Sequence, residues 1–120
     1  MCVNPVSMVS FRAGKIELNA IHKSDLSNYD SIKMLARQRF CDLLIEKKEM
    51  NKFNSDYIVY QILARRKWIK PDYVFALEAT TVHKNTPLED VSEIIYQASK
   101  KAANATKDIT LELARKFIGK

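Results

Sequence analysis

The chain has 120 residues and a formal net charge of +6 at pH 7, with 47% hydrophobic and 28% charged side chains. This length suits one compact domain spanning residues 1–120, and the hydrophobic fraction excludes a disordered tail. No apolar run approaches the roughly 20 residues of a membrane span, and no signal-peptide pattern opens the chain. We therefore expect a cytoplasmic protein with no membrane partner.

Cysteine and histidine are too sparse for the common catalytic or metal motifs. Cys2 and Cys41 are isolated and form neither a disulfide framework nor a metal knuckle, which suits a reducing compartment. The two histidines, His22 and His83, lie near no nucleophile motif, and no residues have metal-ligand spacing. We expect no catalytic residues, no metal and no cofactor, so that an enzyme is the less favoured class.

Glycine and proline number only two and three, which favours a helix-rich α+β fold over a sandwich of many short strands. Apolar residues alternate between Val9 and Ile21 and predict an N-terminal β-hairpin or one bent strand, with Gly14 in the turn. After a cap at 27–30, apolar residues recur every three or four positions and predict a first central helix that ends near Met50.

The second half of the chain predicts a second central helix, one buried strand and a long C-terminal helix. The second helix would start at Asn54 or Ser55 and end before Pro71. Aromatic and β-branched residues over 73–82 predict a strand that is apolar on both faces. Thr86-Pro87-Leu88-Glu89 is an N-terminal capping signature for the last helix, with a break near Asn104 as an alternative.

Charge is distributed unevenly: segments 25–70 and 98–120 are net positive, whereas 71–97 is net negative. The densest cluster, Arg65-Arg66-Lys67-Trp68-Ile69-Lys70, combines four cations with one indole. Cations bind phosphates, and an indole can stack on a base, although cations also stabilise a helix C-terminus without any ligand. The leading interpretation is a small basic nucleic-acid-binding or regulatory protein that contacts DNA or RNA through Arg65, Arg66, Lys67, Trp68, Lys70, Lys33 and Arg37.

Glu49-Met50-Asn51, followed by Ser55, Ile58, Ile62 and Leu63, resembles a helix-turn-helix unit. In such units the second helix lies in the major groove of DNA. The resemblance covers about 18 residues, and it implies that the bases would be read by Asn54, Ser55, Tyr57 and Gln61. Two helices joined by a polar turn would explain the same residues.

The main alternative is a protein-interaction module, such as an inhibitor, an adaptor or a subunit of an assembly. The last helix carries a seam of apolar and small residues that could pair with a second copy or a partner. This seam consists of Ile95, Ala98, Ala102, Ala105 and Ile109.

A minor alternative is a nuclease. Pro71-Asp72, then Glu78-Ala79-Thr80, then a helix that holds Gln97, resembles fragments of the PD-(D/E)xK nuclease core. The resemblance implies that Asp72 and Glu78 hold a divalent metal. Thr80 stands where the family has a lysine, and the two acids fall on one strand where the family uses neighbouring strands.

Overall fold

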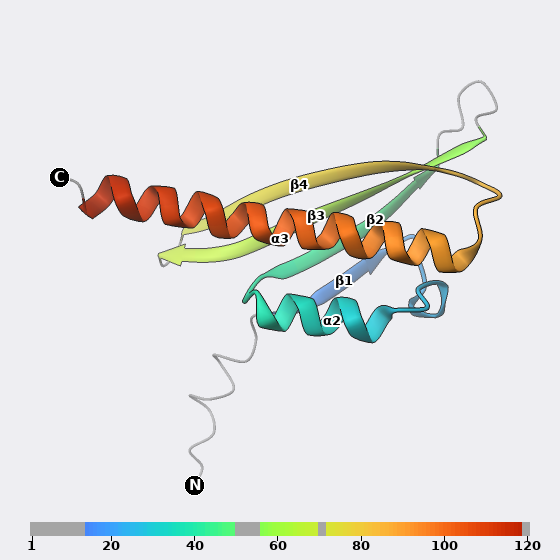
Figure 1. The fold of residues 1–120 in the computed structure, drawn as a ribbon, viewed down its shortest axis with the longest axis horizontal. Helices are drawn as coiled ribbons and strands as arrows, with labels where there is room; N and C mark the ends of the chain where they lie inside the picture. Colours follow the sequence, from blue (N-terminus) through green and yellow to red (C-terminus); the bar gives the residue numbers. More distant parts are fainter. Residues whose placement is uncertain (1–13, 50–55, 70–71, 119–120) are drawn as a thin grey trace, which may run out of the picture.

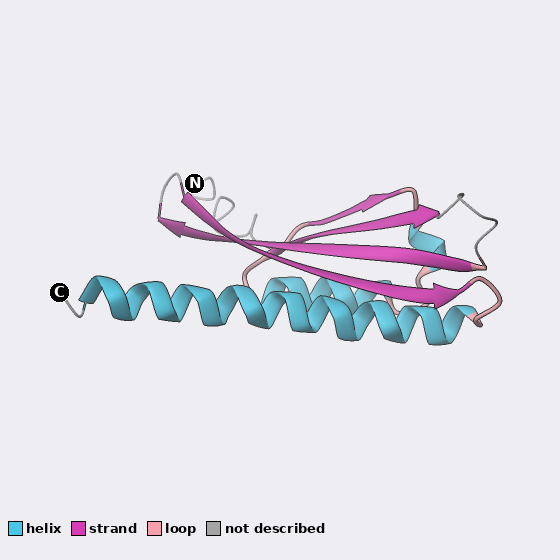
Figure 2. Ribbon diagram, turned by 90° about the horizontal axis from the view of Figure 1, so that it is seen from above, coloured by secondary structure: helices cyan, strands magenta, loops and turns pink. Residues whose placement is uncertain are grey.

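A computed structural model describes residues 14–49, 56–69 and 72–118 of the chain. In chain order its elements are β1 (Ile16–Asn19), the 3-10 helix η1 (Lys23–Asp25), α2 (Tyr29–Gln38), β2 (Asp42–Glu49), β3 (Tyr57–Ile69), β4 (Asp72–His83) and α3 (Leu88–Ile118). The strands form one mixed sheet in the order β1-β2-β3-β4, in which only the β1–β2 pair is parallel. Both α-helices lie on the same face of this sheet (Figures 1 and 2).

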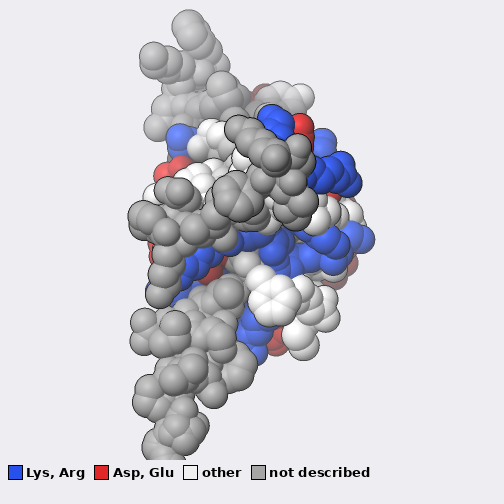
Figure 3. Space-filling view, turned by 90° about the vertical axis from the view of Figure 1, so that its left-hand side faces the viewer, with Lys and Arg blue, Asp and Glu red and all other residues white. Residues whose placement is uncertain are grey.

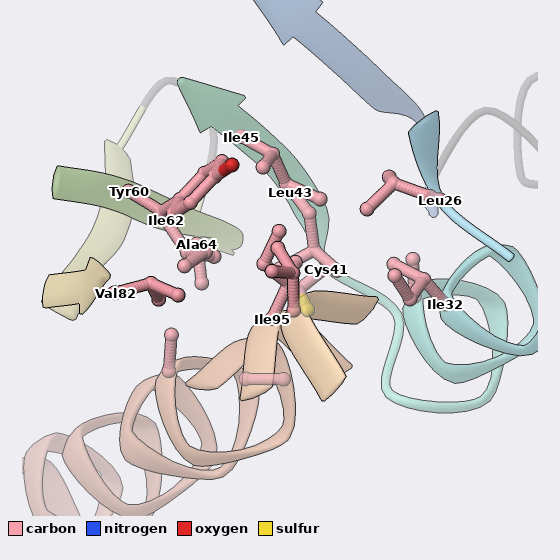
Figure 4. Packing of buried hydrophobic residues seen from close by; sticks show 14 residues of the cluster. Leu26, Ile32, Cys41, Leu43, Ile45, Tyr60, Ile62, Ala64, Val82 and Ile95 are labelled. Atoms are coloured by element: carbon pink, nitrogen blue, oxygen red, sulfur yellow. The ribbon is translucent and has the colours of Figure 1, made fainter. Parts of the chain in front are cut away.

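The hydrophobic core lies between the sheet and the two helices (Figure 4). Alternate residues of each strand point toward the helices, because successive side chains of a strand face opposite sides. The register places Leu43 opposite Ala64 and Ile45 opposite Ile62. The core is completed by buried residues of the two helices, among them Ile32, Leu35, Ala36, Ile95, Ala102 and Ala103.

The long C-terminal helix that the capping signature predicts is present, and it runs unbroken past Asn104. Its first turn forms on Pro87, whose carbonyl accepts hydrogen bonds from the amides of Asp90 and Val91. The buried polar residues of α3 are small and recur every seven positions, at Ser92, Ser99 and Thr106. Small side chains let a helix approach a sheet closely, so α3 packs along both β3 and β4.

The prediction of two central helices is wrong, because the first helix ends at Gln38 and the chain then enters β2. The helix is stopped by Phe40, which adopts the left-handed conformation with φ of 54°. The amide of Phe40 donates to the carbonyl of Arg37, and the amide of Cys41 donates to that of Ala36. This is the Schellman arrangement, in which the left-handed position is usually occupied by glycine. Because phenylalanine occupies it here, the sequence contains no recognisable signal for the end of the helix.

The second predicted helix is the strand β3. Its apolar residues satisfy a period of two as well as a helical spacing, and Tyr60, Ile62 and Ala64 are all buried against the helices. The β-branched and aromatic residues at its start favour the strand. The helix-turn-helix prediction is therefore wrong, and its residues Asn54 and Ser55 lie outside the described part of the chain.

The remaining strands concern two further expectations. β1 pairs in parallel with β2, and the part of the predicted hairpin that contains Val9 lies outside the described residues. β4 is close to the predicted strand but is not buried on both faces. Phe75 and Leu77 are 53% and 58% exposed on the face without helices, which we call the open face.

Candidate nucleic-acid interface

The cations predicted to bind phosphates lie at the end of β3. Arg65 and Lys67 are exposed on the open face, whereas Arg66 points toward the helices and is half-buried. The side chain of Trp68 and all of Lys70 lie outside the described part. A strand therefore presents these cations on both sides of the sheet, where a helix would have presented them around its end.

Arg65 is held in place from two sides. Its Nη2 donates to Oδ2 of Asp42 over 2.7 Å, and its guanidinium carbon lies 4.7 Å from the centre of the Tyr73 ring. The hydrogen bond to Asp42 raises the pKa of Arg65. The side chain keeps 45% of its surface exposed. Arg65 is thus an oriented cation that remains accessible to a ligand.

Arg66 and Arg39 lie on the other side of the sheet, where both charges act on the thiol of Cys41. Nε of Arg66 donates to Oγ1 of Thr106 over 3.2 Å. Nε of Arg39 is buried and meets no hydrogen-bond acceptor among the described residues. A buried donor without an acceptor costs free energy.

The end of α2 is joined to these cations through Gly14 and Asp42. Oδ1 of Asp42 accepts from the amides of Gly14 and Lys15 over 3.2 and 3.0 Å. Gly14, with φ of 93°, is pressed against α2, so that an added Cβ would lie 2.8 Å from Cα of Arg37. Arg37 is exposed, and Lys33 lies one turn earlier on the same helix.

These contacts gather cations from three separate segments at one end of the molecule. We call this surface the basic end, and it consists of Lys15, Arg37, Arg39, Arg65, Arg66 and Lys67. Figure 3 shows many basic side chains on the side of the molecule where α3 finishes. The opposite end, where α3 begins, carries Glu89 and Asp90 in the first helical turn.

The predicted base-reading residues lie elsewhere. Tyr57 is the first residue of β3, eight positions before Arg65, and packs edge-on against His83 with ring centroids 5.4 Å apart. Gln61 follows on the same strand and is half-buried. Tyr57 and Gln61, the two members of this set that the structure describes, therefore do not lie at the basic end.

The predicted interaction seam is mostly part of the chain's own core. Ile95 and Ala102 have no exposed surface, and Ala98 and Ala105 are half-buried. Only Ile109, at 38%, is exposed. The seam packs mainly against the sheet, so it offers little surface to a second protein.

The two acids of the nuclease resemblance are not neighbours. Asp72 and Glu78 lie six positions apart on the single strand β4, which corresponds to a separation of about 20 Å. Glu78 points to the helices and pairs with Nζ of Lys101 over 3.6 Å. Within residues 14–49, 56–69 and 72–118, no three side chains of metal-ligating type come together.

Sequence reasoning missed the exposed apolar residues of the open face. Tyr73, Phe75 and Leu77 are 42%, 53% and 58% exposed, and they follow one another along this face of β4. Beside them a hollow in the sheet is lined by Lys15, Glu17, Asp42, Leu43, Leu44, Leu63, Arg65 and Phe75. Residues 73–77 are apolar without interruption, so the sequence contains no alternation that would separate the two faces, and only the position of the helices shows which alternate set is exposed.

Comparison of the chain with protein families, curated proteins and solved structures finds no match. In the part of the chain that the structure describes, no helix has the length and apolar character needed to cross a membrane.

Proposed function

We propose that the protein binds nucleic acid and that its basic end holds the phosphate backbone. The observation that carries this proposal is the convergence of cations from the start of β1, the end of α2 and the end of β3. Residues far apart in the sequence are joined there by the contacts of Asp42 and Gly14. A chain of phosphates requires cations spread over a surface in this way.

Two features distinguish this surface from an ordinary solvated one. Arg65 is oriented by Asp42 and Tyr73 before any ligand arrives, so less conformational entropy is lost on binding. Arg39 and Arg66 both act on the thiol of Cys41, so a second pair of cations lies together on the other side of the sheet. Glu89 and Asp90, in the first turn of α3, lie at the opposite end and far from this surface, so their charges oppose binding there only weakly.

The test is a binding titration of fluorescent oligonucleotides at several salt concentrations. Arg37→Ala with Lys67→Ala removes two exposed cations of the basic end. If both contact phosphates of a single strand, the slope of log affinity against log salt should become shallower by about 1.4. Affinity at low salt should fall as well.

The matched control is Lys23→Ala with Lys84→Ala, which removes the same charge far from the basic end. Both lysines are exposed. Loss of these two lysines should change the salt slope little, because salt screens charges that do not touch the bound nucleic acid. Equal effects of the two pairs would mean that net charge alone attracts the ligand, and the basic end would lose its role. Absence of binding at low salt would refute the proposed function itself.

A further inference from the structure

The open face of the sheet continues from the basic end as a row of exposed aromatic and aliphatic side chains. The register aligns Asp42, Arg65 and Phe75 across β2, β3 and β4, and the next exposed row is Leu44, Leu63 and Leu77. Lys67 lies opposite Tyr73. Cations and rings therefore share one face of the sheet, and α2 and α3 both lie on the other face (Figure 2).

The two rings near the basic end, Tyr73 and Phe75, are exposed on the open face. Tyr73 and Phe75 have ring centroids 6.4 Å apart and planes inclined by 48°. The Arg65 guanidinium lies against Tyr73, which leaves Phe75 without a ring or cation stacked on it among the described residues. Phe75 also borders the hollow, beside Leu44 and Leu63. A flat apolar ligand would find stacking and burial here.

We infer that the open face is a base-stacking site, so that the preferred ligand is a single-stranded nucleic acid whose bases stack on Phe75 while Arg65, Lys67 and Lys15 hold its phosphates. This inference rests on the proposed function. Single strands expose the faces of their bases, whereas a duplex keeps them stacked inside. The hollow is lined by leucines and Phe75 together with Lys15, Arg65, Glu17 and Asp42, and Lys67 adds a further cation beside Tyr73. Apolar side chains with cations beside them match a chain of bases joined by phosphates.

The chemistry of the surface argues for this ligand over a second copy of the chain. An interface between two open faces would bury Arg65 and Lys67, and Lys67 would lose its hydration unless a carboxylate of the other copy met it, whereas Asp42 already pairs with Arg65 of its own chain. A single strand instead brings a negative charge for each base. Leucines around the rings add apolar contact that every base can use, which predicts weak sequence preference.

The experiment compares Phe75→Leu with Tyr57→Leu, because both replace an exposed aromatic residue of the open face. Phe75 lies near the basic end and Tyr57 at the far end of β3, with exposures of 53% and 51%. The probes are a fluorescent oligothymidine and a duplex of equal length, and circular dichroism confirms folding. Phe75→Leu should weaken oligothymidine binding by about fivefold or more, with an unchanged salt slope. Tyr57→Leu should leave it unchanged.

The outcomes separate the two proposals. If Phe75→Leu leaves oligothymidine binding unchanged while Arg37→Ala with Lys67→Ala weakens it, the stacking site is refuted and phosphate binding by the basic end survives. Equal losses for duplex and single strand would also refute stacking. Light scattering on the same samples adds a last outcome: if Phe75→Leu converts a dimer to a monomer without changing affinity, the open face is a self-association surface. If the unmodified protein binds neither probe at low salt, both proposals fail.

Discussion

Cys41 is enclosed by the core at the point where α2 gives way to β2, with 1% of its surface exposed. Burial raises the pKa of its thiol to about 11, against an ordinary value of 9.0, and the nearby charge of Arg66 only partly opposes this. The unfolded chain therefore releases the thiol proton at lower pH than the folded chain. The contribution of this thiol to the free energy of unfolding is fully present below pH 9 and should be lost as pH rises toward 11.

The size of this effect can be measured with Cys41→Ala as the reference. Because one pKa unit is worth about 1.4 kcal/mol, the free energy of unfolding should fall between pH 8 and pH 10 by about 1.4 kcal/mol more in the parent protein than in Cys41→Ala. Urea titrations at the two pH values give both quantities. Other titrating groups are common to both proteins, so they cancel in the comparison. Parallel pH dependences would show that the thiol is not held protonated by burial.

At the scale of elements, the boundary between α2 and β2 depends on a residue that is strained. Phe40 has φ of 54° and is 66% exposed, so little packing compensates for the left-handed backbone. Phe40→Gly should raise the free energy of unfolding by about 0.5 to 1 kcal/mol, after allowance for the greater freedom of glycine in the unfolded chain. Chemical denaturation monitored by circular dichroism measures the change.

Met34→Gly is the control for that substitution. Met34 is 55% exposed and lies within α2, so the change again replaces a large exposed apolar side chain with glycine. There the backbone is helical, and the loss should be about 1 kcal/mol. A destabilised Phe40→Gly protein would mean that the phenylalanine ring contributes contacts that outweigh the strain.

The same elements show what the sequence could and could not predict. The capping signature at Thr86-Pro87 is specific, and α3 begins where it indicates. Over 40–49 and 57–69, apolar residues fit both a helical and a strand period, and the deciding events are a phenylalanine in the place of glycine and pairing with distant strands. Local patterns do not contain that information.

At the scale of the whole molecule, one part of the candidate site could be predicted from the sequence and another part could not. The cluster of cations at 65–67 can be recognised in the sequence. Its proximity to Arg37 and Arg39 cannot, because it depends on the packing of Gly14 against α2 and on the hydrogen bonds that Asp42 accepts from Gly14 and Arg65. The aromatic row needs the register of β3 and β4, which pairs Arg65 with Phe75 and Lys67 with Tyr73. The acidic first turn of α3 lies far from the end of β3 because α3 runs back along the sheet (Figure 1).

The two-layer fold should unfold as one unit, because α3 packs on β3, β4 and α2 through a single core. Ala102 is completely buried in that core, so Ala102→Glu places an unpaired carboxylate between helix and sheet. We expect a loss of about 3 kcal/mol or more, or complete unfolding, with helical and aromatic signals lost together in one urea transition.

Lys100→Glu, on the exposed side of the same helix, should change stability by less than about 0.5 kcal/mol. If Ala102→Glu remained as stable as Lys100→Glu, or if only the helical signal decreased, α3 would not be an integral layer. The sheet that carries the basic end and the open face would then have to be stable without α3.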